Sequence, residues 1–598
     1  MPTFKRQDQE QLEKAQDLLD SGAPADHAGF VKSLFFGRLH MDELMPYPKQ
    51  DPDEAERTNA LLEKVDSFLR EKVDADRIDR EEAIPPEVIA GLGQLGVMGM
   101  TVPKEYGGGG FSHTAYCRVL ERIGAHCAST AVMVGAHQSI GLKALVLMGN
   151  EQQKSRWLPM LARGEKLAAF CLSEPQVGSD AANVQTTARL SDDGTHYLLN
   201  GDKRYATNAA IAGLMTVMAK TQVEIKGKTK DKVTAFIVTP DMPGFEVVSP
   251  NRSKHGVRGS WQGTLKFTNM RVPKENILGE LGKGLKVALS VLDYGRCTLS
   301  AGCVGGAKRA LQMAIDHATT RRQFDRTIGS FGLIKQKIAR MAEWCFAMDA
   351  MTYLAAGLVD RHHGDIMLET AIAKLFCSEG LWQIADDLMQ IWAGEGYMRE
   401  HGVERMLRDA RINRIVEGTT EVMTAFVALV GMKGVGETLE GILRLTKHPV
   451  HNFGRLASFA RQEFSDLVIG PHCDDLHPQL QEEGKTLSDL TRRLARDVIK
   501  ALRIHREGIL DQQLVQERLA WAAIEIYAIA AVLSKLSAML EKYDRTGNGD
   551  AKWQQNLLIG KSFCHHAADR IGRRLDDLWH NRDDEIVAVA DSVMGMTA

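Results

Sequence analysis

The sequence has no paired cysteines, no excess of positive charge and no recognisable metal-binding spacing. Its nine cysteines include no CxxC pair, and an odd number of isolated thiols in a chain of 598 residues argues against a disulfide framework and favours a reducing compartment. A formal net charge of −3 argues against a nucleic-acid-binding protein, because no basic excess is available to neutralise phosphates. The pairs His362–His363 and His565–His566 lack the spacing of metal ligands, so no metal site is predicted.

The sequence also lacks the patterns of a targeting peptide and of a membrane span. The segment MPTFKRQDQEQLEKAQ at the start is polar, mixed in charge and acidic, unlike a signal or transit peptide. The longest apolar run, residues 519–533, is interrupted by Glu525 and is expected to fall short of a membrane span, so we interpret it as a buried helix. Together these features predict a cytoplasmic protein with bacterial-type targeting.

The periodicity of apolar residues changes along the chain and divides it into domains. Segments such as ALLEKVDSFLREKV have helical spacing, whereas HYLLNGDKRYAT, LMTVMAKTQVEI, DKVTAFIVTP and GTLKFTNMRV alternate like strands joined by Asp-Gly, Pro and Asn-Gly turns. The glycine run at 107–110 lacks the GxGxxG context of a dinucleotide-binding fold. A run of glycines, Gly434, Gly436 and Gly441, is interpreted as a linker before the last helical region.

We therefore predict an α+β, mostly α, fold with a helical bundle, a central β domain, a second helical bundle and an additional C-terminal helical domain. A groove between a sheet and helical bundles is a favoured place for a cofactor. The predicted ranges are 1–52 for an N-terminal lead-in, 53–166 for the first helical domain, 167–282 for the β domain, 283–432 for a helical catalytic domain and 433–598 for the extension.

One acid, Glu417, lies at a break in a helical pattern. It follows the apolar pair Ile415 and Val416 and precedes the helix breaker Gly418. A carboxylate held among apolar neighbours is a candidate general base, because loss of hydration raises its pKa toward the working pH. The alternative from this segment alone is a solvated acid at the end of a helix.

Several motifs in order resemble those of the acyl-CoA dehydrogenase flavoproteins. They are AAFCLSEPQVGSDAANVQTTA, LDYGR, RRQFDR, QIWAGEGYMRE and RIVEGTTE. The segments KSLFFGRLHMDELMPYP and GAHQSIGLKALVLMG, with the region after about residue 445, are similar to the very-long-chain branch of that family. The resemblance covers nearly the whole chain and implies FAD as the cofactor.

The resemblance implies a set of flavin-binding residues. Phe170, Leu172 and Ser173 would lie along the isoalloxazine ring, where hydrogen-bond donors tune its potential. Tyr205, where many relatives have Trp, would contact the flavin, and the Thr207 hydroxyl would approach its reactive nitrogen, with Asn208 beside it. Each of these could instead be a turn or a packing residue. The remaining residues that the resemblance assigns to the cofactor are Arg321, Phe324, Gln390, Ala393, Gly394 and Thr419.

Arg321 is implied to neutralise the FAD pyrophosphate, and the loop from Gln390 to Gly394 to reach the FAD of a neighbouring subunit. The chain is therefore expected to form at least a homodimer. A glutamine common in relatives after the RxxF motif is replaced by Gly332, which leaves one FAD contact in doubt. Arg321 could otherwise belong to a solvated charge cluster with Arg322 and Arg326.

Substrate contacts are also implied by the resemblance. Ser179, Asp293, Arg296 and Gly418 would contact the acyl-CoA, although Asp293 and Arg296 at i and i+3 could equally form an intrahelical ion pair. Two small residues could leave a channel for a long acyl tail or serve helix packing, namely Gly141 and Ala144.

The implied reaction is α,β-dehydrogenation of a long-chain acyl-CoA to the trans-2-enoyl-CoA. Glu417 would remove the α-proton, the β-hydrogen would leave as hydride to flavin N5, and the Glu417 N–H with a ribityl hydroxyl would meet the developing charge. An electron-transfer flavoprotein would accept the electrons. The alternatives are an acyl-CoA oxidase that uses oxygen and a catalytically idle scaffold protein.

The C-terminal region carries two amphipathic patterns. In HNFGRLASFARQEFSDLVI an apolar stripe includes Phe453, Leu456, Phe464 and Leu467, and the segment 490–506 combines leucines with arginines. The resemblance implies peripheral contact with a membrane surface, and packing on the protein is the alternative.

Overall fold

The computed structural model describes residues 29–361, 365–445, 473, 475–547 and 552–596. The described chain separates into two compact units, a larger unit of residues 49–419 and a smaller unit formed by residues 29–48 together with 420–596. The segments before residue 49 thus fold with the C-terminal helices, although more than 350 residues separate them in the sequence. The C-terminal stripe around Phe453 and the pair His362–His363 lie outside the described residues.

The larger unit begins with a layer of helices. Helix α4 starts at Pro52, and the carboxylate of its N-cap residue Asp51 accepts hydrogen bonds from the next free N–H groups. Proline also occupies the first position of α6. The elements are α4 (Pro52–Lys72), α5 (Ala75–Glu81), α6 (Pro86–Gln94), α7 (His113–His126), α8 (Ala128–Gly135), a π-helical turn η4 (Ala136–Gly141), α9 (Leu142–Met148) and α10 (Glu151–Ala162).

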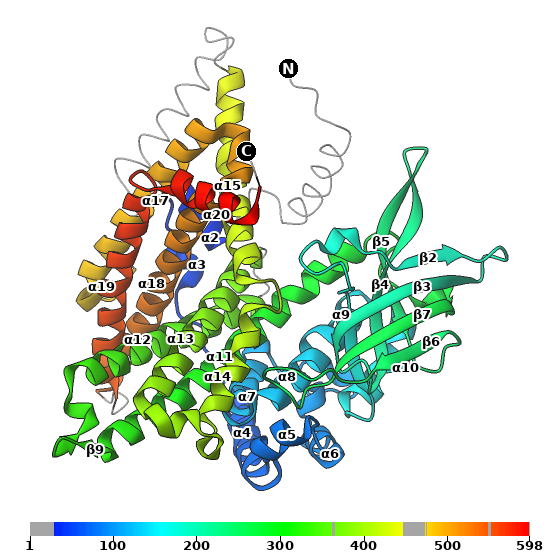
Figure 1. Cartoon of the computed structure of the whole chain (residues 1–598), viewed down its shortest axis with the longest axis horizontal. Coiled ribbons are helices and arrows are strands. Elements are labelled where there is room, and N and C mark those ends of the chain that lie inside the picture. The colour runs from blue at the N-terminus through cyan, green and yellow to red at the C-terminus, as the bar shows by residue number, and fades with distance from the viewer. Residues whose placement is uncertain (1–28, 362–364, 446–472, 474, 548–551, 597–598) are drawn as a thin grey trace. The chain divides into compact units, whose positions relative to one another are not determined.

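A twisted sheet follows in the order β6-β7-β3-β2-β4-β5-β8, with β1 paired parallel to β4 (Figure 1). The four predicted strand segments all lie in it, which confirms the central β region. The strands are β1 (Leu167–Cys171), β2 (Thr187–Leu190), β3 (His196–Thr207), β4 (Ala212–Ile225), β5 (Lys228–Val238), β6 (Phe245–Ser249), β7 (Gln262–Pro273) and β8 (Ile277–Leu278).

The predicted Asn-Gly turn was wrong. Asn200 and Gly201 lie inside β3, where the register against β7 shifts between Leu199 and Gly201. A β-carbon on Gly201 would come within 2.6 Å of the Thr186 hydroxyl, so this glycine permits a close approach between strands rather than a chain reversal.

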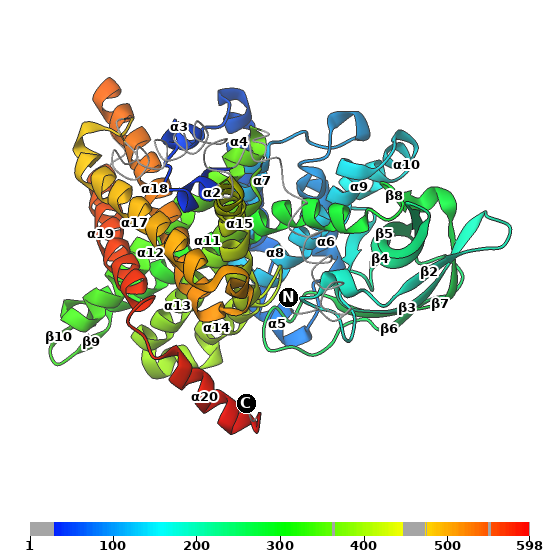
Figure 2. The same cartoon turned by 90° about the horizontal axis from the view of Figure 1, so that it is seen from above.

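Long helices form the rest of the larger unit, and α11 and α12 pack on α7, which Figures 1 and 2 show near the centre of this unit. Helix α11 makes its most extensive contacts with α13 and α7. These elements are α11 (Gly284–Thr320), the hairpin β9 (Arg322–Gln323) and β10 (Arg326–Thr327), α12 (Gly332–Asp360), α13 (Met367–Tyr397) and α14 (Val403–Arg411).

The smaller unit is helical. It contains α2 (Phe30–Phe35), α3 (Met41–Leu44), α15 (Thr420–Leu445), α17 (Gln481–His505), α18 (Gln513–Thr546), α19 (Trp553–Asp577) and α20 (Asp583–Met594). Glycines 434, 436 and 441 lie within α15, so their interpretation as a linker was wrong. The helix continues because Gly431 and Gly434 face the rings of Phe35 and Phe36, where a β-carbon would approach ring atoms to 2.3 and 2.9 Å.

Three described segments are long and apolar enough for a bilayer by length and composition, namely Ala128–Met148, Thr420–Glu440 and Gln513–Thr546. The expectation that the run at 519–533 is too short for a span was therefore wrong, whereas its interpretation as a buried helix is confirmed. In α18, 89% of the apolar window is buried within the protein. The buried Glu525 of this helix accepts hydrogen bonds at 3.0 and 3.1 Å from Arg570 of α19.

Candidate active site

Glu417 lies in a tight turn directly after the short helix η9 (Ile412–Arg414). Its φ of 58° is in the left-handed region, which side chains other than glycine rarely adopt, and the next residue, Gly418, has a φ of 96°. Lys374 of α13 donates a hydrogen bond of 2.6 Å to the Gly418 carbonyl and so fixes the turn. Strain of this kind persists where the surrounding structure imposes it, which is common at active sites.

The carboxylate of Glu417 points at the backbone of α11. A β-carbon on Gly295, the glycine of LDYGR, would lie 3.1 and 3.3 Å from the two carboxylate oxygens. Oxygen Oε2 is buried and has no hydrogen-bond partner among the described residues. Burial raises the pKa of Glu417, while Arg296 and Lys374 oppose this increase. A carboxylate with a raised pKa and a free oxygen is suited to accept a proton from a weak carbon acid.

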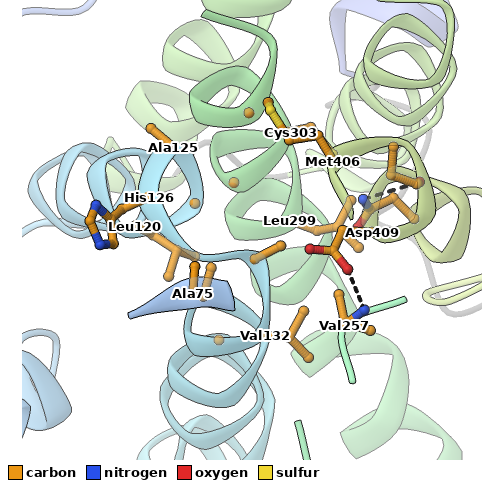
Figure 3. A pocket seen from close by; sticks show the side chains of 18 of the residues that line it. Ala75, Leu120, Ala125, His126, Val132, Val257, Leu299, Cys303, Met406 and Asp409 are labelled. Atoms are coloured by element: carbon orange, nitrogen blue, oxygen red, sulfur yellow. Dashed lines mark hydrogen bonds between the residues drawn. The ribbon is translucent and has the colours of Figure 1, made fainter. Parts of the chain in front are cut away.

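Glu417 forms part of the wall of a cavity of about 870 Å³. Figure 3 shows this cavity between the α7–α8 segment, which carries Leu120 and Val132, and α11, which carries Leu299 and Cys303. Asp409, which also lines the cavity, accepts a hydrogen bond of 2.5 Å from the Val257 N–H. A cavity with both apolar and charged lining residues and a carboxylate in its wall fits a ligand with an aliphatic part, a polar part and one reactive carbon.

The small residues that open the cavity differ from the two predicted from the sequence. Gly302 lines the cavity, and a β-carbon there would have no neighbour within 4 Å. Gly141 instead packs against β1, since its β-carbon would lie 2.8 Å from the Ala168 carbonyl carbon, and Ala144 is fully buried in the core. These placements match the packing role that the sequence left open. The small residues of the segments ERIGAHCAS and SAGCVGG, several of which line the cavity, could have indicated its position from the sequence.

The ends of β1 and β3 place a second group of predicted residues together. Arg204 donates through its N–H to the Ser173 carbonyl at 2.9 Å, which ties the segment after β1 to β3. Tyr205 has a φ of 62° and is 59% exposed despite its aromatic ring. Thr207 lines the cavity and accepts a hydrogen bond of 2.8 Å from Gln262. Phe170 is buried in the core, and Leu172 and Ser173 are half-buried.

This region has the donor set that a flavin requires. The Trp261 indole N–H and Arg204 Nε are buried without hydrogen-bond partners among the described residues. Arg204 directly precedes Tyr205, and Trp261 directly precedes Gln262, the strand partner of Thr207. Orphaned buried donors beside a strained, exposed aromatic ring are typical of a site completed by a planar polar group. The residues therefore fit FAD.

Comparisons with known proteins identify the family. Three matches cover most of the larger unit: the N-terminal domain of acyl-CoA dehydrogenases at residues 55–165, the middle domain at 169–270 and the C-terminal domain at 282–431. A fourth, the ACAD9/ACADV C-terminal domain, covers 478–597. The chain belongs to the acyl-CoA dehydrogenase family. It is thus an FAD-dependent oxidoreductase acting on CH–CH groups, as the resemblance implied.

Individual relatives agree with this assignment. The chain is 38% identical to the mitochondrial very long-chain specific acyl-CoA dehydrogenase of Homo sapiens, covering 92% of this chain and 84% of that protein. It is 34% identical to the probable acyl-CoA dehydrogenase FadE10 of Mycobacterium tuberculosis over 97% and 90% of the two chains. A solved acyl-CoA dehydrogenase complexed with FAD from Bacillus anthracis matches with a TM-score of 0.77, 29% identity and 96% coverage of both chains.

Butyryl-CoA dehydrogenase from Megasphaera elsdenii matches with a TM-score of 0.59 and 33% identity. The match covers 97% of that shorter enzyme and 63% of this acyl-CoA dehydrogenase. The additional helical region of the present chain is therefore an extension of a common core, which confirms the predicted fold class.

Five predicted cofactor residues of this dehydrogenase lie far from Glu417 in the same chain. Arg321 follows Gly295 by 26 residues at the end of the continuous helix α11, which corresponds to roughly 39 Å at 1.5 Å per residue. Both views show the β9–β10 hairpin at the opposite end of the larger unit from the sheet (Figures 1 and 2). The group comprises Arg321, Phe324, Gln390, Ala393 and Gly394.

This distant group is exposed and strained in a similar way to Tyr205. Phe324 is 86% exposed with a φ of 51°, and Ala393 kinks α13 with a φ of 52° and a ψ of −133°. Trp392 of the same segment stacks on His317 of α11 at 4.4 Å between ring centres, which holds the kink against the end of α11. Phe324 thus presents an apolar ring to solvent from a disfavoured backbone conformation.

The remaining predicted residues have other placements. Arg296 and Asp293 form an ion pair of 3.6 Å, and Asp293 also accepts a hydrogen bond of 3.3 Å from Thr370. This is the intrahelical ion pair that the sequence left as an alternative. The charge of Arg296 also acts on Glu417. Burial raises the pKa of Asp293 to about 6. Ser179 is exposed in the loop after β1, and Thr419 is half-buried two residues after Glu417.

Sequence reasoning missed the ion pair that holds the loop after β1. Lys203 lies 2.7 Å from Glu174, and both side chains are almost completely buried. Glu174 also accepts hydrogen bonds from the Thr186 N–H and hydroxyl at 3.0 and 2.6 Å. The pair therefore fixes the segment that carries Leu172 and Ser173. The motif SEP contained the acid, but its partner lies 29 residues away.

Proposed function

We propose that this chain dehydrogenates long-chain fatty acyl-CoA to trans-2-enoyl-CoA, with Glu417 as the base that removes the α-proton. The observation that carries the proposal is the Glu417 carboxylate, buried at the cavity wall with a raised pKa and an unpartnered oxygen. The α-hydrogen leaves as a proton to this carboxylate, the β-hydrogen leaves with its electron pair, and a carbon–carbon double bond forms. FAD, when bound, supplies the acceptor for that hydride.

The protein's own residues prepare the site for this step. The left-handed turn at Glu417 and the Lys374 bond to Gly418 hold the carboxylate in one place before the substrate binds, so little reorganisation is needed. The backbone N–H of Glu417 is the proposed donor to the thioester oxygen as negative charge develops there. Arg296 and Lys374 limit the rise in the pKa of Glu417 and so favour its ionised form.

The proposal of a long acyl chain rests on the cavity and on the relatives. The chamber extends from Glu417 past Leu299 and Gly302 to residues of α7 and α8. Several relatives carry the name very long-chain specific acyl-CoA dehydrogenase. Each methylene group that becomes buried contributes about 0.8 kcal/mol, so contact of the tail with the apolar residues of the lining, such as Leu299, favours longer tails.

A homodimer is proposed because one chain cannot bring all the predicted cofactor residues together. Tyr205 and Thr207 lie at the cavity, whereas Arg321 lies roughly 39 Å further along α11. A second copy that presents its Arg321, Phe324 and Ala393 to this cavity would complete the site and cover the exposed phenyl ring. Two equivalent sites would then form around a two-fold axis.

An electron-transfer flavoprotein is the proposed electron acceptor. A cytoplasmic location, with peripheral membrane contact through the C-terminal region, remains a separate prediction. A solved structure described as the electron transferring flavoprotein of Acidaminococcus fermentans is 32% identical over 64% of this chain.

The decisive experiment is anaerobic reduction of the flavin by acyl-CoAs of graded chain length. We expect rapid bleaching by long-chain substrates, slower by 10²- to 10⁴-fold in Glu417→Gln because general base catalysis is lost. Glu421→Gln, an exposed acid one helical turn later, is the matched control. Unchanged reduction in Glu417→Gln would refute the proposed base, and peroxide release under air without another acceptor would favour an oxidase.

A further inference from the structure

A cluster of three buried metal-ligand side chains lies between α7 and α11, apart from the cavity. His113 and Cys117 are four residues apart on α7 and share one face of that helix, while Cys297 comes from α11. One ligand atom of each residue lies within 4.8 Å of the other two. Cys117 and Cys297 are fully buried, and His113 is only 5% exposed.

Neither ring nitrogen of His113 makes a hydrogen bond of good geometry among the described residues, and the polar group that interacts with the ring is the Cys297 thiol. The edges and faces of Tyr116 and Tyr294 surround it, with ring centres at 6.1 and 5.4 Å. Another fully buried histidine of the same unit, His137, bonds the carbonyls of Met98 and Leu161 and accepts from the Ala168 N–H. A buried imidazole beside only thiol groups is poorly satisfied, because a thiol is a weak hydrogen-bonding group, so the contrast with His137 indicates room for a stronger ligand at the cluster.

A disulfide between the two cysteines does not explain the cluster. Their sulfur atoms are 4.0 Å apart, about twice the length of a disulfide bond, and a bond between them would leave both nitrogens of His113 unsatisfied. Simple packing explains two small buried thiols but leaves the imidazole beside weak hydrogen-bonding groups only. A ligand for all three groups satisfies the whole set.

We propose that His113, Cys117 and Cys297 bind a Zn²⁺ ion that links α7 to α11. Imidazole nitrogen and thiolate sulfur are the ligands that Zn²⁺ prefers, and two thiolates balance its double charge, so the occupied site is neutral in an apolar environment. Tetrahedral coordination at about 2.3 Å per Zn–S bond places the sulfurs roughly 3.8 Å apart, close to the observed 4.0 Å. The three residues leave the fourth position for a small ligand such as water.

The site would brace the walls of the cavity. Helix α7 carries Leu120 and Gly124, and α11 carries Leu299 and Gly302, all of which line it. The two helices already pack closely, since a β-carbon on Gly124 would lie 2.8 Å from the Gly302 carbonyl oxygen. The proposal does not depend on the proposed reaction, because none of the three ligands is assigned a role in it.

The test is the zinc content of the purified full-length flavoprotein after dialysis against a weak chelator. We expect about one Zn²⁺ per chain, and less than a tenth of that in Cys117→Ser, Cys297→Ser and His113→Leu. His113→Cys supplies another ligand and should retain zinc. Cys345→Ser, which removes a buried thiol of α12 outside the cluster, is the matched control.

Cobalt gives a second measurement on the unmodified protein. Metal-stripped wild type titrated with Co²⁺ should develop thiolate charge-transfer and tetrahedral d–d absorption at one equivalent, and these bands should be absent from folded His113→Leu. Failure of wild type to bind either metal, equal zinc content in wild type and the three ligand variants, or a Cys117–Cys297 disulfide detected by mass spectrometry would each overturn the proposal.

Discussion

At the scale of single residues, the position of Glu417 depends on a glycine from a distant part of the chain. Gly295 leaves the space that the carboxylate occupies on α11, with Ile140 of the π-helical turn on the other side. A base that is displaced by a fraction of an ångström loses overlap with the proton that it removes. The same helix offers Gly302, which has open space around it and lines the cavity.

These two glycines give a matched prediction. Gly295→Ala would place a methyl group 2.8 Å from Ile140 Cγ2 and 3.1 Å from Glu417 Oε1, so we expect flavin reduction to slow by about 10- to 100-fold with flavin content unchanged. Gly302→Ala should leave the base undisturbed and shift the preference toward shorter acyl chains. Stopped-flow reduction with a chain-length series measures both effects, and equal rates in Gly295→Ala and wild type would contradict the first.

The pH dependence of reduction is also decided by individual side chains. Glu417 acts only when deprotonated, so the rate should fall as pH decreases through its raised pKa. Lys374 lowers that pKa through its positive charge, and its own pKa is lowered by burial to about 8. Lys374→Met should therefore move the acid limb of the profile to higher pH, whereas Lys374→Arg should retain it. The comparison applies below pH 8, and an unmoved limb in Lys374→Met would refute the coupling.

At the scale of elements, α2 joins the smaller unit partly through its contact with α15. Helix α15 contains four glycines between residues 431 and 441, a composition that weakens a helix by roughly 1 kcal/mol per glycine relative to alanine. The loss is offset where glycine allows the Phe35 and Phe36 rings to lie directly on the helix backbone. The aromatic pair of α2 thus compensates for a weak helix elsewhere in the chain.

A second matched pair of variants tests this interpretation. Gly431→Ala would place a β-carbon 2.3 Å from the Phe35 ring, and overpacking of this kind destabilises by about 1–3 kcal/mol. Gly436→Ala meets no neighbour within 4 Å and should stabilise α15 by up to about 1 kcal/mol. Thermal denaturation of the full-length protein should show midpoints shifted in opposite directions. A shift of the same sign in both would mean that helix propensity alone governs this segment.

At the scale of the whole molecule, the proposed homodimer predicts complementation between inactive chains. If each site combines Glu417 of one chain with Arg321 of the other, a hybrid of Glu417→Gln and Arg321→Ala chains contains one intact site and one doubly altered site. Co-refolding or co-expression in equal amounts should then restore about a quarter of wild-type activity, because half of the dimers are hybrids. Activity no higher than the average of the two single variants would show that each site is built from one chain.

The sequence alone indicated most element types and the candidate for the base. Alternation at 196–207 and 263–272 and the motif around Glu417 are local patterns, so strands β3 and β7 and the catalytic candidate could be predicted. Only the tertiary structure decided that Gly295 faces Glu417, that Gly434 continues a helix, that Gly141 packs while Gly302 opens the cavity, and that His113 meets Cys297 across 184 residues. The physical reason is that the neighbouring residues in the sequence do not determine the structural role of a glycine or a cysteine. Its role is set by the atoms that approach it, and those atoms come from segments far along the chain.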